Sequence, residues 1–256
     1  KKCQMGIEGA RPRRRLCWQP EPRTRLLPLA ADRIAPAAAS PEARARRALT
    51  SRIIRFDDPC QGERRRVETF IEDSYARAYG SHIGRHYPTL MSVQDVDGTI
   101  YAVVGFRLAR DEPLFLEQYL DDPVETVVTD AIGTIVTRPE IVEIGNLASN
   151  GRGATIFLFA AMVRHLLSSG AHFAVATATE ELRGMFQKAG LGALRLAAAD
   201  PGRLIDHGLS WGDYYRTRPI VLAGSISAAA TPLIRFAETT PTARAVRTRL
   251  HFRSEP

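Results

Sequence analysis

A strand, a loop, a helix and a second strand follow one another in the middle of the chain. Residues 141–148 (IVEIGNLA) are extended and apolar, and a glycine-broken polar loop joins them to a helix expected from Ala154 to about Leu167. A short apolar strand, residues 171–178 (AHFAVATA), comes next. The longest unbroken apolar run, Ala154 to Val163, is only about half of the ~20 residues that a membrane-spanning helix requires. We therefore expect a soluble protein in which this helix packs on a sheet.

The flanking segments extend this unit to a mixed α/β pattern. Residues 51–56 (SRIIRF) predict a first strand, and residues 64–79 predict an amphipathic helix that Gly80 ends. Asp97-Gly98 is a strong hairpin signal between two further strands. Residues 112–131 are part helix and part loop, residues 180–190 predict another helix, and the last strands are expected within 192–198 and 211–226. This order predicts a mixed sheet with helices on both faces.

The positive charge of the chain is concentrated near its start. The formal net charge is +7, but residues 1–66 hold 17 Lys/Arg and 7 Asp/Glu, a net of +10, and the remainder is slightly acidic. We expect a mobile Arg/Pro/Ala-rich arm (1–50), a catalytic domain (51–226) and a C-terminal extension (227–256). A basic groove for nucleic acid in the body of the protein is not expected.

The cysteines indicate the expected compartment. Cys3, Cys17 and Cys60 form no zinc-ligand spacing with other Cys or His residues, and their odd number predicts no disulfide framework. No charged-then-apolar leader is visible at the start of the sequence. A reducing, cytoplasmic location is therefore expected.

The central loop has the composition of an anion-binding turn. Gly151 and Gly153 allow backbone N–H groups to turn inward, Arg152 adds a positive charge, and the following helix presents its N-terminus. The natural ligand of such a loop is a pyrophosphate or a phosphopantetheine phosphate. The pattern is neither a Walker loop nor the three-glycine dinucleotide loop, and a structural turn remains the alternative interpretation. The candidate ligand-binding residues are Leu147, Ser149, Asn150, Gly151, Arg152, Gly153, Ala154 and Thr155.

The element order and this loop resemble the GNAT acyltransferases from about Ser51 to Ile226. In that family a splayed fourth strand precedes a Q/R-x-x-G-x-G/A loop that holds the pyrophosphate of coenzyme A. Residues 180–191 (EELRGMFQKAGL) resemble the family's following helix, which often carries a tyrosine that protonates the departing thiolate. Phe186 stands at the aligned position here, so Tyr214 and Tyr215 are the candidates for that role.

A closer resemblance covers roughly residues 67–226. The segments YGSHIGRHYPTL, LFLEQYLDDPVE, IVEIGNLAS and ADPGRL…WGDYYRTRPIVLAGSI are similar to the thermostable hemolysin family of proteobacteria. The family name implies haemolytic activity. The same region is more distantly similar to acyl-homoserine-lactone synthases, which take acyl groups from carrier proteins. In both comparisons the carboxylate of the fourth strand matches Glu143.

Acyl transfer from a thioester to an amine needs a base, a polarised carbonyl and close positioning. Glu143 alternates with its apolar neighbours, and burial would raise its pKa toward the range of a base; a strand carboxylate paired with an Arg is the alternative. Backbone amides near Leu147 are the expected oxyanion donors, as the GNAT resemblance implies. Asn146 orients the acceptor or caps the loop.

Further polar residues are candidates for binding the acceptor. Glu117, Gln118 and Tyr119 are expected to bind its polar part, and a solvated helix face is the alternative for Glu117 and Gln118. Arg107 meets an acceptor carboxylate or pairs with Asp111. His82 and His86 are four residues apart but lack a third ligand in the sequence nearby, so no metal site is expected. The helix's apolar residues form core packing or an acyl-chain tunnel; they are Ile156, Phe157, Phe159, Ala160, Met162 and Val163.

The sequence thus predicts a GNAT-like N-acyltransferase that moves an acyl group, expected to be a fatty one, from coenzyme A or an acyl carrier protein to an amine. The acyl thioester is a co-substrate, and no tightly bound cofactor is expected. No Ser-His-Asp order or G-x-S-x-G elbow is present, which disfavours a hydrolase. A membrane-active hemolysin and a non-catalytic acyl-coenzyme A sensor are the alternatives.

Overall fold

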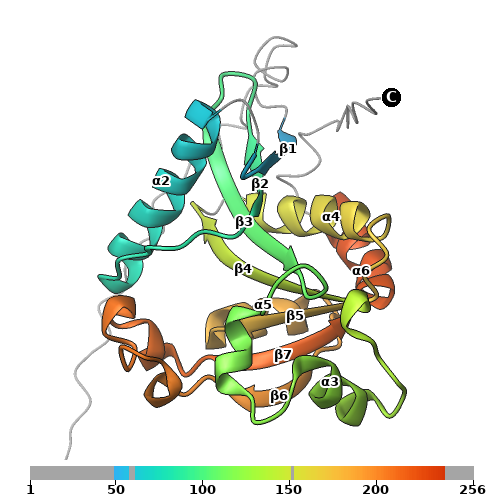
Figure 1. The fold of residues 1–256 in the computed structure, drawn as a ribbon. Coiled ribbons are helices and arrows are strands. Elements are labelled where there is room, and N and C mark those ends of the chain that lie inside the picture. The colour runs from blue at the N-terminus through green and yellow to red at the C-terminus, as the bar shows by residue number, and fades with distance from the viewer. Residues whose placement is uncertain (1–48, 58–60, 151–152, 240–256) are drawn as a thin grey trace, which may run out of the picture. The chain divides into compact units, whose positions relative to one another are not determined.

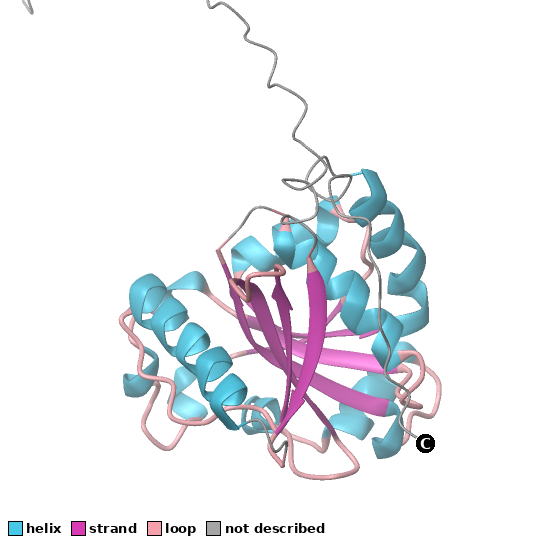
Figure 2. Ribbon diagram, turned by 90° about the horizontal axis from the view of Figure 1, so that it is seen from above, coloured by secondary structure: helices cyan, strands magenta, loops and turns pink. Residues whose placement is uncertain are grey.

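The computed structural model describes residues 49–57, 61–150 and 153–239. Within these residues, seven strands form one sheet in the order β1-β2-β3-β4-β5-β7-β6, and helices cover both of its faces (Figures 1 and 2). The predicted mixed α/β class is therefore confirmed. The strands are β1 Thr50–Arg55, β2 Thr89–Gln94, β3 Ile100–Leu108, β4 Ile141–Ser149, β5 Phe173–Ala178, β6 Leu194–Ala198 and β7 Ile220–Ser225.

The helices up to α5 follow the predicted order, whereas α6 lies in the segment predicted only as a C-terminal extension. They are α2 Gln61–Tyr79, α3 Val124–Ile132, α4 Ala154–Leu166, α5 Glu180–Lys188 and α6 Ile226–Thr239. Short 3₁₀ helices lie at Phe115–Tyr119, Arg138–Glu140, Pro201–Arg203, Leu209–Trp211 and Tyr214–Thr217. The segment 112–131 thus contains one 3₁₀ helix and most of α3, in agreement with its mixed pattern.

The predicted hairpin joins β2 to β3. The side chain of Asp95 accepts hydrogen bonds from the N–H groups of Asp97 (3.0 Å) and Thr99 (2.9 Å), and Gly98 has a φ of +82°. Glycine takes this left-handed conformation without steric cost. The Asp97-Gly98 signal therefore marks the turn correctly.

The two central strands diverge. β4 pairs with β5 in parallel from Ile141 to Ile144 only, although both strands run further (Figure 1). The β3–β4 pairing changes register between Gly145 and Ala148, and Asn146 between them has a φ of +48°. An irregularity of this kind bends the strand that carries it. β4 consequently leaves the edge of β5 after Ile144.

Strand alternation divides the core between the two faces of the sheet. Val104 and Phe106 pack with α4, whereas Val103 packs on the opposite face with α2. Helix α4 is apolar on most of its surface because it lies between the sheet and α6. The predicted domain end at residue 226 falls on the first residue of α6, and Ile226 and Leu233 of this helix are buried in the same cluster as α4.

Candidate functional site

A cavity of about 330 Å³ opens where β4 and β5 diverge. Its walls on one face of the sheet are aliphatic and aromatic side chains of three helices. These are Phe159, Met162, Val163 and Leu166 of α4, Leu182, Met185 and Phe186 of α5, and Ile226, Ala229 and Leu233 of α6. Concave apolar spaces of roughly 300–1,000 Å³ are typical of small-molecule sites.

The same cavity reaches the other face of the sheet. Tyr75 and Tyr79 of α2 line it there together with Tyr214, and α2 packs on the face opposite to α4. The ring centroids of Tyr79 and Tyr214 are 5.3 Å apart, and those of Tyr75 and Tyr79 are 5.7 Å apart. The cavity therefore passes through the gap between the two strands and joins an apolar arm to an aromatic mouth.

Small residues on β5 keep the apolar arm open. Ala174 and Ala176 line it, whereas Val175 between them points into the core on the other face. The ring of Phe186 lies against that of Phe159, with centroids 5.7 Å apart. Phe186 is thus part of the apolar wall rather than a proton donor.

Of the two candidate tyrosines, only Tyr214 lines the cavity. Burial raises the pKa of Tyr214 well above its ordinary value, so the hydroxyl is a protonated donor at neutral pH. The hydroxyl of Tyr215 instead lies 2.5 Å from that of Tyr119, and burial raises the pKa of Tyr215 to about 12. Tyr119 and Tyr215 therefore bind each other away from the described lining.

The glycine-containing loop lies at the edge of the cavity. Leu147, Ser149 and Thr155 line the cavity, and Thr155 donates a hydrogen bond to the Ser149 hydroxyl (2.8 Å). Gly153 has a φ of +74° and precedes Ala154, where α4 begins. Asn150 is exposed, and Gly151 and Arg152 lie outside the described residues. A phosphate site in this loop stays a prediction.

Glu143 is buried, with 1% of its surface exposed, and it is not part of the described lining. Its carboxylate accepts hydrogen bonds from the N–H groups of Phe115 (2.9 Å) and Leu116 (2.8 Å). Arg107 Nε lies 3.2 Å away, and the Tyr87 hydroxyl donates a further hydrogen bond. Burial raises the pKa of Glu143, while these donors oppose the rise by stabilising the charged form. The alternative predicted for Glu143, pairing with an arginine, is the arrangement observed.

Arg107 also differs from its predicted pairing. Its guanidinium contacts Glu143 and, at 3.3 Å, Glu112, whereas Asp111 pairs with Arg110 at 3.5 Å. The predicted pair with Asp111 is therefore wrong. The Arg107 guanidinium also lies 4.2 Å from the ring centroid of Tyr87, a cation–π contact.

Tyr87 connects these groups, and no motif in the sequence marks it as important. Its ring lies against Gly105 and Gly145, which face each other on β3 and β4. A Cβ atom added at Gly105 would come within 2.7 Å of the Tyr87 Cβ, and one added at Gly145 would overlap the Tyr87 hydroxyl. The paired glycines therefore form a slot that this ring fills.

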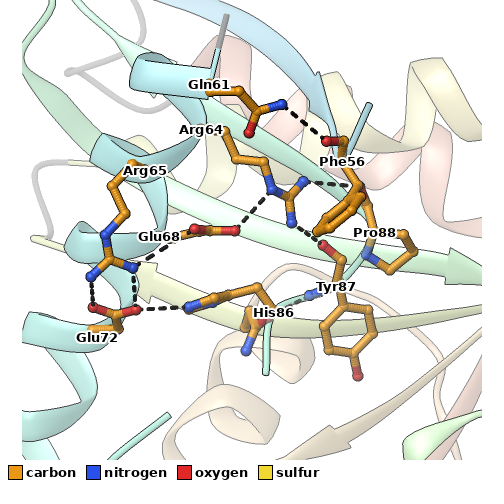
Figure 3. A network of polar contacts seen from close by, with 10 residues as sticks. Phe56, Gln61, Arg64, Arg65, Glu68, Glu72, His86, Tyr87 and Pro88 are labelled. Carbon is orange, nitrogen blue, oxygen red and sulfur yellow. Dashed lines mark hydrogen bonds and ion pairs between the residues drawn. The ribbon is translucent and has the colours of Figure 1, made fainter. Parts of the chain in front are cut away.

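The backbone of Tyr87 is fixed on both sides. Its N–H donates to Oδ1 of Asn146 (3.0 Å), so the side chain of Asn146 holds this segment rather than the loop before α4. The buried Arg64 of α2 donates to the carbonyls of Tyr87 (2.9 Å) and Pro88 (3.0 Å) and to Glu68 (2.8 Å; Figure 3). The irregular part of β4 is thereby tied to α2 through Tyr87.

His86 takes part in this scaffold. His86 Nε2 lies 3.0 Å from a carboxylate oxygen of Glu72 (Figure 3). Over the part of the chain that the structure describes, no group of three or more His, Cys, Asp or Glu side chains is arranged to hold a metal ion.

Glu117 caps the turn at Phe115–Tyr119, the same turn whose N–H groups Glu143 binds. Its carboxylate accepts from the N–H of Leu114 (2.8 Å) and forms two short contacts with Arg138 (2.7 and 2.8 Å). Arg138 also contacts Glu125 (2.9 Å), and Gln118 is exposed and donates to the carbonyl of Phe115 (3.1 Å). Glu117, Gln118 and Tyr119, predicted to bind substrate, therefore do not meet at the cavity.

Glu117→Gln is expected to lower the free energy of unfolding by about 1–3 kcal/mol at neutral pH, because charge-assisted hydrogen bonds are lost. The contact with Arg138 lowers the pKa of Glu117 below its ordinary 4.5, so the unfolded state binds the proton more readily. The stabilisation is therefore present above about pH 4.5 and is lost on acidification through the folded pKa.

Urea unfolding from neutral to acidic pH measures both effects. Glu125→Gln is the matched control, since Glu125 shares Arg138 with Glu117 but makes only one of the contacts. The variant's unfolding free energy should converge with that of the wild type in acid. Equal loss in both variants at neutral pH would contradict a special role for Glu117.

Several solved structures share this fold. TofI, solved in a complex with an inhibitor and MTA, matches with a TM-score of 0.52 at 13% identity, over 72% of this chain and 96% of TofI. FeeM, an N-acyl amino acid synthase from uncultured soil microbes, matches at 0.51 and 13% identity, over 73% and 96%. The AHL synthase LasI matches at 0.50 and 15% identity, over 70% and 90%. The chain thus has a GNAT-like fold, and sequence comparison with curated proteins gave no match.

The family model described as Thermostable hemolysin matches residues 58–230, which include the described strands β2 to β7 and the lining from Tyr75 to Ala229. Among the described helices, none is long and apolar enough to cross a membrane. The match covers more than half of the chain, and the protein belongs to the thermostable hemolysin family.

Proposed function

We propose that the protein transfers a fatty acyl group from a pantetheine thioester, carried by coenzyme A or by an acyl carrier protein, to an amine. The observation that carries this proposal is the cavity that passes between β4 and β5 and joins an apolar arm to a tyrosine-lined mouth. A hydrocarbon chain gains free energy by leaving water for such an arm. The acceptor then approaches from the opposite face of the sheet.

The cavity suggests a division of roles. The amine nitrogen forms a bond to the thioester carbonyl carbon as the carbon–sulfur bond breaks, and backbone N–H groups near Leu147 stabilise the oxyanion. Glu181, the one carboxylate in the described lining, accepts the proton of the amine. The Tyr214 hydroxyl, which burial keeps protonated, donates a hydrogen bond to the departing thiolate, and the thiolate then takes a proton from water. Glu143 acts as a positioning residue that holds the Phe115–Leu116 backbone. The loop of Ser149 to Thr155 is the proposed phosphate site.

Ala176→Phe is expected to abolish acyl-thioester binding because the phenyl ring fills the space between β5 and α4. Calorimetry with dodecanoyl-coenzyme A and dodecanoyl-pantetheine measures this loss. Equal affinity for both ligands indicates a carrier-protein donor, whereas tighter binding of the coenzyme A ester indicates that its nucleotide is bound. Ala131→Phe, on the exposed face of α3, is the matched control.

The family description names haemolysis, and the proposed activity predicts when lysis should occur. Purified protein should lyse red cells only when a thioester donor and an amine are supplied, since the lytic agent would be an acylated product. Lysis by the protein alone, unchanged by Ala176→Phe, would overturn the proposal. Wild-type protein that binds neither ligand at millimolar concentration would overturn it as well.

A further inference from the structure

Helix α6 lines the apolar arm of the cavity beside α4. Ile226, Ala229 and Leu233 line the cavity, and their spacing places them on one face of the helix. They share the cavity with Met162 and Leu166 of α4, the helix against which α6 packs. Ile226 and Leu233 are each 2% exposed, so this wall is a packed part of the core.

Helix α6 is anchored at its first residue and borders the turn after α5. The N–H of Ile226 donates to the carbonyl of His172 in the segment before β5 (2.9 Å). Pro232 lies beside the turn after α5, where its Cβ is 3.9 Å from the position of a Cβ at Gly190. A helix held in this way presents a fixed wall to whatever occupies the arm.

Ala229 is the small residue in this wall. It lies between two large aliphatic side chains and is only partly buried, because the cavity borders it. The described side chains of α4 and α6 around it are apolar, so the matching occupant is hydrocarbon. An acetyl group would leave this part of the arm unfilled, whereas a longer chain would reach Ala229.

We propose that α6 sets the length of the acyl chain that the protein accepts, with Ala229 and Leu233 as the residues that determine it. This inference rests on the proposed function, since it assigns the apolar arm to the acyl group. Each methylene that leaves water strengthens binding by about fourfold. The affinity should therefore rise with chain length until the end of the chain meets α6 and should rise no further beyond that length.

The test compares Ala229→Phe with Ala228→Phe. Ala228 is exposed on the same helix, so its variant carries the same added ring outside the cavity. Calorimetry with acetyl-, octanoyl-, dodecanoyl- and hexadecanoyl-pantetheine gives the length profile of each protein, and circular dichroism verifies that both are folded. We expect Ala229→Phe to lose at least about tenfold in affinity for the longest chain that the wild type binds well, with acetyl-pantetheine unaffected. Ala228→Phe should match the wild type.

Leu233→Val tests the same wall in the opposite direction. The smaller side chain should extend the plateau of affinity to a longer chain while Met162 and Leu166 keep their places. This variant retains a branched apolar residue and so keeps most of the packing of α6. It provides a result even if the Ala229 variant fails to fold.

The outcomes separate the two proposals. A wild type that binds no acyl-pantetheine of any length overturns the proposed function and the inference with it. Wild-type binding with the same length profile in Ala229→Phe, Ala228→Phe and Leu233→Val overturns the role of α6 alone.

Discussion

Gly145→Ala is expected to lower the free energy of unfolding by about 3 kcal/mol, at the upper end of the range for overpacking. The added Cβ overlaps the hydroxyl of Tyr87, whose ring already lies against Gly105. Tyr87 cannot move aside easily, because its backbone is hydrogen-bonded to Asn146 and Arg64 and its ring lies beside Arg107. Gly145 also lines the cavity, so acyl-thioester binding should weaken together with stability.

Urea unfolding of matched variants measures this effect. Gly184→Ala in the middle of α5 is the control: a Cβ there meets nothing within 4 Å, so this change should stabilise the helix by about 0.5–1 kcal/mol. Combining Gly145→Ala with Tyr87→Ala should cost less than the sum of the two single changes, since the overlap is gone. Strict additivity would contradict the slot described for Tyr87.

Glu143→Gln is expected to cost about 3 kcal/mol of unfolding free energy, the lower end of the range for breaking a buried ion pair. The N–H groups of Phe115 and Leu116 each donate to one carboxylate oxygen of Glu143. In the variant an NH₂ group replaces one of these oxygens, so one hydrogen-bond donor faces another and the bond is lost. Arg107 also loses its buried counter-charge. The turn at Phe115–Tyr119 should loosen in consequence.

Stability and turnover together distinguish a positioning residue from a base. We expect Glu143→Gln to lose both, and hydrogen exchange at Phe115 and Leu116 to accelerate. Glu112→Gln removes only the more exposed partner of Arg107 and should change stability by less than about 1 kcal/mol. If Glu143→Gln kept full stability but lost the acidic limb of the pH–rate profile, Glu143 would be a base instead.

The sequence predicted the fold well because its signals are local. Asp97-Gly98, Gly80 and the acidic first turn of α5 each act on neighbouring backbone, and they mark the ends of elements correctly. The apolar surface of α4 required burial on both sides, and this agrees with its place between the sheet and α6. The C-terminal segment has no such clear signal, and the sequence therefore does not predict α6.

The site was less predictable because it depends on contacts between distant segments. Tyr87 matters because two glycines, one on each neighbouring strand, leave room for its ring, and no pattern within its own segment shows this. Glu143 was identified as important, yet its partners, Phe115 and Leu116, come from an irregular turn. The cavity arises from the end of β4–β5 pairing at Ile144, a property of two strands together.

The sheet order has a consequence for synthesis on the ribosome. β7 lies between β5 and β6, so one edge of β5 stays unpaired until Ile220–Ser225 has left the exit tunnel. At ordinary elongation rates this interval lasts a few seconds, during which an open strand edge can pair with another chain. The last strand to be made is therefore the one that completes the sheet. A chain that stops before Ile220 would lack β7, so β5, whose Ala174 and Ala176 line the cavity, would have no neighbouring strand on that edge.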